Sequence, residues 1–181
     1  MLCAAIAALY LLPSTSWAAP EKAATQFESQ TFNDWKLDCE AQGKQTKQAD
    51  TAVQAKRCFI FQNVHLQDSD QRILGVIVGN LGEKGQSILH VTVPLGVFIP
   101  AKVALKIGEG EQFQAGVQTC TPLGCEVVFE LDEFVIGALL DAELTSVAFL
   151  DAVTRRQITV GLSMTGFKTA YQALKKTLAT K

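Results

Sequence analysis

Beyond residue 18, the sequence lacks any apolar run long enough for a transmembrane helix, which needs about 20 consecutive apolar residues. It also lacks an excess of one charge. The 16 Lys and Arg residues are mixed with 18 Asp and Glu residues, and the net charge is −2. Nucleic acids and anionic membrane surfaces both select basic patches. We therefore expect no transmembrane segment in the mature chain and no nucleic-acid partner.

Histidine is scarce as well, with two residues in 181. His65 and His90 lie in different strand-like runs without HxH or HxxxH spacing, so we expect ordinary strand residues and not metal ligands. A zinc site would need all four cysteines beyond residue 18 to converge, and an exported protein oxidises such thiols. The sequence predicts no metal site and no cofactor.

The first 18 residues contain no charge and are mostly apolar, but the run is too short for a membrane span and ends at Pro13. Ser16 and Ala18 fit the small-x-small pattern of a cleavage site, so residues 1–18 predict a signal peptide that is cleaved after Ala18. No Lys or Arg precedes the apolar run, which indicates a translation start further upstream. The alternative is a buried N-terminal helix. Cys3 belongs to the removed segment.

Without residues 1–18 the chain keeps 163 of its 181 residues, enough for one domain with a hydrophobic core. Residues 19–31 are small and polar and predict a flexible leader, which leaves residues 32–181 as a single domain. The remaining cysteines are even in number. This favours two disulfides and an oxidising location: the periplasm, the outer surface or the exterior. These cysteines are Cys39, Cys58, Cys120 and Cys125.

Short runs rich in Val, Ile, Phe and Thr alternate with turns rich in Gly, Pro, Asp and Asn from residue 32 onward. In the first run Trp35, Leu37 and Cys39 alternate with charged residues, the period of a half-buried strand. Residues 41–56 have no apolar face and predict a mobile surface loop. This rhythm predicts a sandwich or barrel. Further strands are expected over residues 57–66, 72–81, 87–99, 103–108, 113–120, 125–131, 146–151 and 156–163.

Two segments depart from the strand pattern. Residues 132–142 begin with Asp132, a suitable N-cap, and predict a short connecting helix. The C-terminal segment predicts a second helix that Thr165 would cap, with Lys175 and Lys176 near the end where the helix dipole favours cations. Its apolar residues form one helical stripe: Phe167, Ala170, Tyr171, Leu174 and Leu178.

Five landmarks follow one another in a specific order. They are WKLDCE (Trp35 to Glu40), Cys58 at the start of a strand, VPLGVFIPAKVALKIG (Val93 to Gly108), CTPLGCE (Cys120 to Glu126) and LSMTGF (Leu162 to Phe167). In this order the chain resembles the invasion-associated locus B family of exported bacterial proteins, over residues 32–178. The family's SLxGF motif has Met164 in place of Leu here, a change that conserves volume.

The resemblance implies an immunoglobulin-like β-sandwich with disulfides Cys39–Cys58 and Cys120–Cys125. It also implies a periplasmic or surface location and a role in the interaction of bacteria with host cells. The family supplies no catalytic residue to carry over. From this resemblance we expect no enzymatic activity and an unidentified protein or cell-surface partner.

The Cys120 and Cys125 pair is the part of the chain that most resembles a redox site. Thioredoxin-like chemistry, however, uses two residues between cysteines at a helix N-terminus, where the dipole lowers the thiol pKa. Here four residues intervene, both flanks predict strands, and Thr121 to Gly124 suits a turn. The turn would place the two cysteines opposite each other, within disulfide range. A structural disulfide is the favoured interpretation, and a redox pair is the alternative.

Three weaker motifs also have structural interpretations. Ser163 in GLSMT occupies the place of a hydrolase nucleophile, but the final Gly is replaced by Thr165 and no His follows His90. The glycines of residues 79–85 match no phosphate-loop spacing and predict a turn. The carboxylates at residues 132 and 133 suit a helix start.

The leading functional hypothesis is therefore a non-enzymatic exported protein that binds a protein or surface partner and supports association with host cells. The alternative is a housekeeping periplasmic module that binds envelope components or unfolded clients. A disulfide oxidoreductase that uses Cys120 and Cys125 is a third hypothesis. The sequence leaves the partner and the oligomeric state open.

Overall fold

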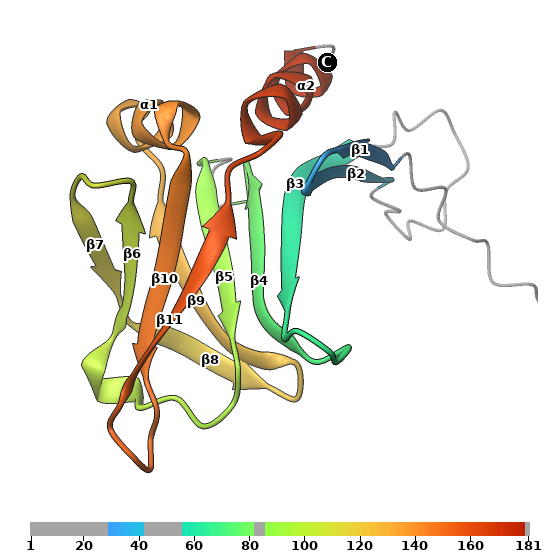
Figure 1. The fold of residues 1–181 in the computed structure, drawn as a ribbon. Helices are drawn as coiled ribbons and strands as arrows, with labels where there is room; N and C mark the ends of the chain where they lie inside the picture. The colour runs from blue at the N-terminus through green and yellow to red at the C-terminus, as the bar shows by residue number, and fades with distance from the viewer. Residues whose placement is uncertain (1–28, 42–55, 82–85, 180–181) are drawn as a thin grey trace, which may run out of the picture.

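The computed structural model describes residues 29–41, 56–81 and 86–179. The chain is mainly β, with two antiparallel sheets and two α-helices (Figure 1). The elements are β1 (Gln30–Phe32), β2 (Trp35–Ala41), β3 (Lys56–His65), β4 (Arg72–Gly79), β5 (Ile88–Val93), the 3₁₀ turn η2 (Ile99–Ala101), β6 (Val103–Ile107), β7 (Gln112–Ala115), β8 (Val117–Thr121), β9 (Gly124–Glu130), α1 (Glu133–Asp141), β10 (Leu144–Leu150), β11 (Gln157–Ser163) and α2 (Phe167–Ala179).

The larger sheet has the strand order β1-β2-β3-β4-β5-β9-β8, and the smaller sheet has the order β11-β10-β6-β7. The period-two pattern places alternate side chains on the inner face of each sheet. In β5, for example, Leu89, Val91 and Val93 are buried, whereas His90 and Thr92 on the opposite face are partly exposed. The two inner faces form one continuous core. The expectation of a mainly β chain is confirmed, and the two layers are the arrangement of a β-sandwich.

Most expected strands form close to their predicted bounds, but two runs are divided. Residues 87–99 form β5 only up to Val93, because Pro94 and Gly96 break the ladder before η2. Residues 113–120 contain two strands, β7 and β8, that lie in different sheets. The chain passes between the layers at Gly116, which is exposed and has open space around it.

At the N-terminal boundary, strand β1 begins at Gln30, two residues inside the segment expected as a flexible leader. It pairs with β2 through a tight turn at Asn33, which has a φ of 52°. Residues 1–18 and the main part of the expected loop, 42–55, lie outside the described residues.

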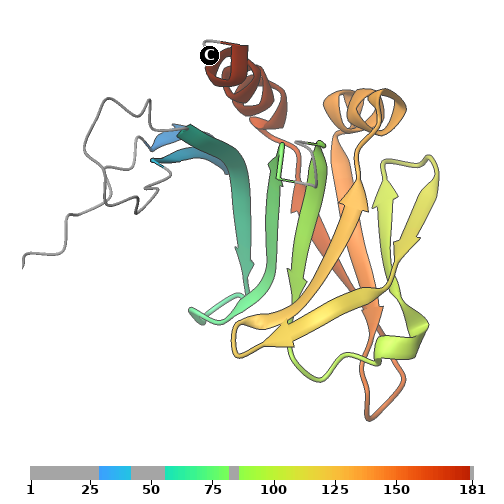
Figure 2. The same cartoon turned by 180° about the vertical axis from the view of Figure 1, so that it is seen from behind.

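Both helices lie at one end of the sandwich, and the β5–β6 and β10–β11 connections lie at the opposite end (Figures 1 and 2). Asp132 caps α1 as predicted, because its carboxylate accepts a hydrogen bond of 2.8 Å from the backbone N–H of Val135. Thr165 does not occupy the corresponding position of α2. That helix begins at Phe167, and the preceding residue is Gly166.

Helix α2 packs its apolar stripe against the ends of β1, β2 and β3. Trp35 is fully buried there, in edge-to-face contact with Phe167 at a centroid distance of 4.9 Å. The Tyr171 ring stacks on the Phe167 ring at a centroid distance of 5.9 Å. The indole N–H of Trp35 donates to the carbonyl oxygen of Ser163 over 2.8 Å. These contacts of Trp35 connect β2, at the start of the domain, to β11 and α2 at its C-terminal end.

Candidate functional site

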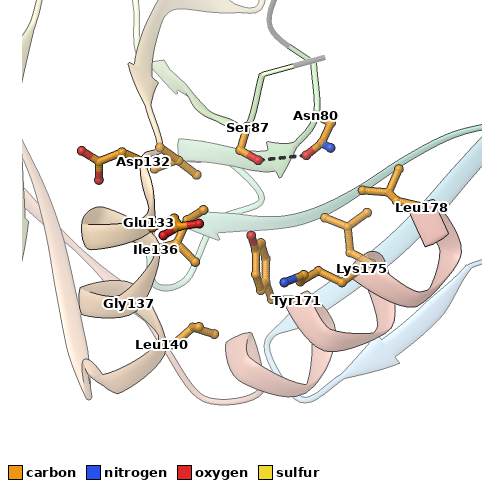
Figure 3. Close-up of a pocket in the computed structure, with 12 residues that line it drawn as sticks. Asn80, Ser87, Asp132, Glu133, Ile136, Gly137, Leu140, Tyr171, Lys175 and Leu178 are labelled. Carbon is orange, nitrogen blue, oxygen red and sulfur yellow. Dashed lines mark hydrogen bonds between the residues drawn. The ribbon is translucent and has the colours of Figure 1, made fainter.

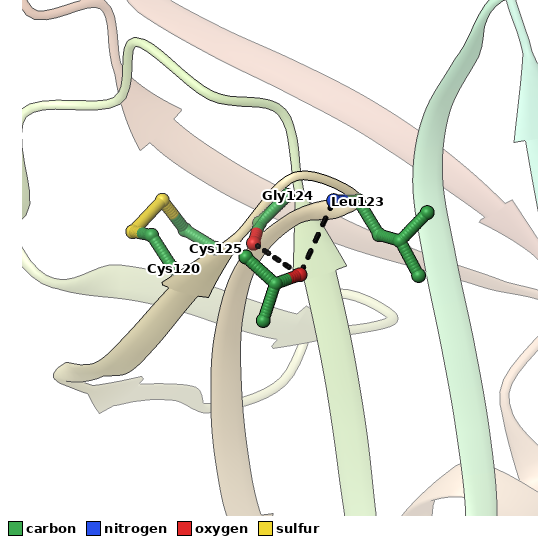
Figure 4. Close-up of a disulfide and its surroundings, with 5 residues drawn as sticks. Cys120, Leu123, Gly124 and Cys125 are labelled. Carbon is green, nitrogen blue, oxygen red and sulfur yellow. Dashed lines mark hydrogen bonds between the residues drawn. A yellow bond between two sulfur atoms is a disulfide. The ribbon is translucent and has the colours of Figure 1, made fainter.

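The close cysteine pair lies at the end of the β8–β9 hairpin, where Cys120 faces Cys125 in the strand register. The two residues form a disulfide with a Cα–Cα distance of 4.0 Å (Figure 4). One further pair, Thr121 and Gly124, closes the ladder, so the loop is tighter than the four-residue turn expected from the sequence. Gly124 has a φ of 135°, and an added Cβ would lie 2.5 Å from the carbonyl oxygen of Val93. Only glycine fits this turn.

The surroundings of this disulfide differ from those of a catalytic dithiol. Both cysteines lie on strands, and neither helix in the described residues begins beside them, so no helix dipole among those residues stabilises a thiolate at this position. The Thr121 hydroxyl accepts a hydrogen bond from the backbone N–H of Leu123 over 3.2 Å and holds the turn (Figure 4). The arrangement is that of a cross-strand link.

The other pair, Cys39 and Cys58, lies on neighbouring strands β2 and β3 and forms a buried disulfide with a Cα–Cα distance of 4.0 Å. It spans 19 residues of sequence, against 5 for Cys120–Cys125. The two bonds therefore restrict the unfolded chain to different extents.

Replacing Cys39 and Cys58 together by serine is expected to lower the free energy of unfolding by about 3 kcal/mol. The same double change at Cys120 and Cys125 should cost about 2 kcal/mol, because the loop that it opens is shorter. Urea unfolding of the oxidised variants, followed by tryptophan fluorescence, measures both losses. A larger loss for the Cys120 and Cys125 variant would contradict the loop-entropy account.

The other residues considered from the sequence do not form a reactive group. The hydroxyl of Ser163 donates to a carboxylate oxygen of Asp34 over 2.6 Å. His90 lies on the outer face of β5, with its Nε2 atom 3.5 Å from a carboxylate oxygen of Glu126, and His65 is exposed on β3. Among the described residues, no group of three or more His, Cys, Asp or Glu side chains has the geometry of a metal site.

A cleft between α1 and α2 is a candidate binding surface, with a volume of about 830 Å³ (Figure 3). Its apolar lining includes Ile136 and Leu140 from α1 and Leu178 from α2, all of which are partly exposed. Glu133 projects from one wall, and Lys175 projects from the other. The cleft thus combines an apolar floor with an acidic wall and a basic wall.

Near one end of the cleft an exposed ion pair joins the two helices, because Lys168 at the start of α2 lies 3.8 Å from the carboxylate of Asp141 at the end of α1. At the other end, the side chains of Asn80 and Ser87 share a hydrogen bond of 2.9 Å (Figure 3). Burial raises the pKa of the Tyr171 phenol, since the charged phenolate is poorly solvated there. Tyr171 therefore contributes a neutral hydroxyl to the cleft.

The sequence matches the family described as "Invasion associated locus B (IalB) protein" over residues 35–175. The match covers most of the chain, including both disulfides and both walls of the cleft. The chain belongs to the IalB family. The resemblance inferred from the five sequence landmarks is confirmed.

A solved structure with the same fold is the crystal structure of invasion associated protein B from Bartonella henselae. It is 22% identical to the present chain with a TM-score of 0.69, and the comparison covers 83% of this chain and 97% of that one. No curated protein matches the sequence. At this identity the likeness shows that the IalB fold is shared.

The helix cleft of this IalB chain was not recognised in the sequence. Its residues come mainly from the β4–β5 connection, α1 and α2, which are far apart in the sequence. The sequence of α1 did contain a sign of the cleft, because its apolar residues lie on more than one face of the helix. Only Val135 and Leu139 of that helix are buried, so the other apolar side chains had to face a second surface.

A second apolar surface lies at the opposite end of the IalB fold. Leu95, Ile99 and Val153 are 58%, 50% and 89% exposed, on connections joined by a hydrogen bond of 2.7 Å from the Ala152 N–H to the Gly96 carbonyl. Hydrogen bonds, first of all from the backbone N–H of Thr154, lower the pKa of the Asp151 carboxyl in the same hairpin.

Among the described residues, no helix is long and apolar enough to cross a membrane. The family and the two paired sets of cysteines are consistent with a protein that is exported.

Proposed function

We propose that this chain is a non-enzymatic exported protein of the IalB family, and that it supports the interaction of bacteria with host cells by binding a protein partner in the cleft between α1 and α2. The observation that carries the proposal is the apolar floor of that cleft. Ile136, Leu140 and Leu178 pack against the edge of the core and stay partly exposed where they line the cleft. Exposed apolar surface of this kind is typical of interaction sites.

The chemistry of the cleft indicates the kind of partner. Its apolar floor suits the apolar face of an amphipathic peptide segment, laid between the two helices. Asp132 and Glu133 on one wall favour a basic side chain of the partner, and Lys175 on the other favours an acidic one. The two opposite charges select one orientation of the bound segment. The cleft contains no pair of groups placed for nucleophilic or acid–base chemistry among its described residues.

Export is part of the same proposal. Residues 1–18 serve as a signal peptide, residues 19–29 as a leader, and the rest as one domain with an immunoglobulin-like strand arrangement. The uncharged apolar start, the small residues before Ala19 and the even number of mature cysteines support this assignment. The working location is the periplasm or the outer surface.

The test replaces the cleft floor by polar side chains of similar size. The double variant Leu140→Gln/Leu178→Gln is expected to reduce capture of the partner from host-cell extracts at least about tenfold, since two apolar contacts are lost. The matched control is Leu95→Gln/Val153→Gln, which makes the same kind of change at the opposite end and should bind normally. Thermal unfolding of both variants verifies that the fold is retained.

A deletion strain complemented with the same variants connects binding to function. We expect the wild type and the control variant to restore uptake by host cells and the cleft variant to fail. Normal uptake by the deletion strain, together with new detergent sensitivity, would instead favour the housekeeping envelope role and overturn the proposal. If only the control variant lost binding, the partner would bind at the opposite end of the molecule and not in the cleft.

A further inference from the structure

Strand β11 is an edge of the smaller sheet, and it is unusually open for an edge. It pairs with β10 on one side through seven regular residue pairs, from Leu144 with Ser163 to Leu150 with Gln157. Its other side is the free border of the sheet.

The direction of its backbone groups follows from two hydrogen bonds on β10. The carbonyl of Leu144 accepts from Gly108 over 2.8 Å, and that of Leu150 accepts from Phe98 over 2.7 Å, so both carbonyls point away from β11. In an antiparallel pair the residues opposite them also point away, and the direction alternates along the strand. The outward N–H and C=O groups of β11 therefore belong to Gln157, Thr159, Gly161 and Ser163.

The last of these residues already has a strand-like partner. The side-chain amide of Gln62 accepts from the Ser163 N–H over 3.1 Å and donates to the Ser163 carbonyl over 3.1 Å. It reproduces the two bonds of a neighbouring strand. In the described part of the chain, no other backbone group pairs with Gln157, Thr159 or Gly161 on this side. Their outward N–H and C=O groups remain available.

The other sheet edges carry features that discourage pairing with another chain. Strand β1 has three residues, and β7 has four and leads directly into the other sheet. Strand β8 has a register shift and ends at the Cys120–Cys125 disulfide. By contrast, β11 has seven residues without a charge, a proline or a bulge. Natural proteins commonly protect their edges by such devices, and β11 has none of them.

We propose that β11 pairs antiparallel with β11 of a second copy of this chain. The pairing is centred on Thr159, which faces Thr159 of the partner, and Gln157 faces the partner's Gly161. Each facing pair exchanges both N–H···O bonds, because all three residues point outward. Ser163 lies beyond the paired segment, where Gln62 already satisfies it. The two smaller sheets then form one continuous sheet through a two-fold interface.

The charges at the two ends of β11 favour a second copy over an unrelated extended peptide. Arg156 precedes the strand and is exposed, and Asp34 lies beside Ser163 at the other end. An antiparallel two-fold pairing brings Arg156 of each copy toward Asp34 of the other. Alternation along the strand places Arg156 on the same face as Val160, toward the layer that also holds Asp34. The edge is therefore complementary to itself in charge as well as in hydrogen bonding.

The decisive variant is Thr159→Pro. It removes the N–H that would bond to the second copy, and it leaves every hydrogen bond between β11 and β10 in place. Its matched control is Gln114→Pro on β7, the other edge of the same sheet. The Ile107 N–H at the end of β6 donates to the carbonyl of Glu111, just before β7. Because the direction of the backbone groups alternates along the β6–β7 register, the N–H and C=O of residue 114 point away from β6. Sedimentation velocity of the purified full chain from about 1 to about 500 µM should reveal a dimer. We expect its Kd to rise about thirtyfold in Thr159→Pro, because two symmetric hydrogen bonds are lost, and to stay unchanged in Gln114→Pro.

A charge exchange provides an independent test. Arg156→Glu and Asp34→Arg should each weaken the dimer, and the double variant should restore it, because the opposite charges meet again across the interface. Thermal unfolding verifies that each variant is folded. The proposal is overturned if the wild type sediments as a monomer at every concentration. It is equally overturned if Thr159→Pro leaves the dimer intact, or if the double exchange gives no recovery.

Discussion

Replacing Trp35 by alanine is expected to lower the free energy of unfolding by about 4 kcal/mol, because a fully buried large aromatic side chain leaves a cavity that its neighbours fill only in part. The loss has three components. The indole contributes buried apolar surface, an edge-to-face contact with Phe167, and a hydrogen bond to the Ser163 carbonyl. Urea unfolding followed by far-ultraviolet circular dichroism measures the change.

Two comparison variants separate these components. Trp35→Phe keeps a ring beside Phe167 but removes the N–H, and it should cost about half as much as Trp35→Ala. Phe134→Ala changes an aromatic residue that is 65% exposed on α1, and it should shift stability by no more than about 0.5 kcal/mol. If Trp35→Ala were as mild as Phe134→Ala, the junction of β2 with α2 would not be a principal part of the core.

The same junction shows how far local sequence patterns determine the fold. Alternation in β2 identified the buried face of Trp35, and the helical spacing of Phe167 and Tyr171 identified the buried face of α2. Both patterns are local, because side-chain direction has a period of two in a strand and 3.6 in a helix. That these two faces meet is a property of the topology, which neither pattern contains.

Gln62 illustrates a contact that local patterns conceal. It occupies an inward position of β3, is only 6% exposed, and donates to the carbonyls of Asp34 and Ser163. A polar residue at that position would be expensive without partners. Ser163 lies 101 positions away in the sequence, so no window along the chain could have identified the pair. The passage of the chain between sheets at Gly116 was hidden for a similar reason.

The candidate sites show the same difference between local contacts, which the sequence indicates, and contacts between distant segments, which it conceals. The disulfide at Cys120 and Cys125 could be anticipated because a turn of suitable residues separates the cysteines, which makes the contact local. The cleft between α1 and α2 could not, because its walls belong to helices separated by β10 and β11. Binding surfaces assembled from distant segments need the three-dimensional arrangement before their chemistry can be judged.

The glycine before α2 is the second position at which a single change should be severe. Gly166 has a φ of 89°, and a Cβ at this position would collide with the carbonyl oxygen of Phe32 and lie 3.2 Å from the Cβ of Asn33. The backbone of the β1–β2 hairpin approaches it directly, since the Asp34 N–H donates to the Thr165 carbonyl over 3.4 Å. A methyl group would therefore strain residue 166 and push the hairpin away from α2.

We expect Gly166→Ala to lower the free energy of unfolding by about 4 kcal/mol, from backbone strain and steric overlap together. Gly96→Ala is a matched control, because Gly96 has a φ of 90° but no neighbouring heavy atom within 4 Å of the added Cβ. It should cost only about 1 kcal/mol, the strain of the left-handed conformation. The difference between the two variants in urea unfolding isolates the contact with Phe32. Equal losses would mean that the β1–β2 hairpin moves aside freely, and that the close packing of Trp35 beneath α2 does not depend on this glycine.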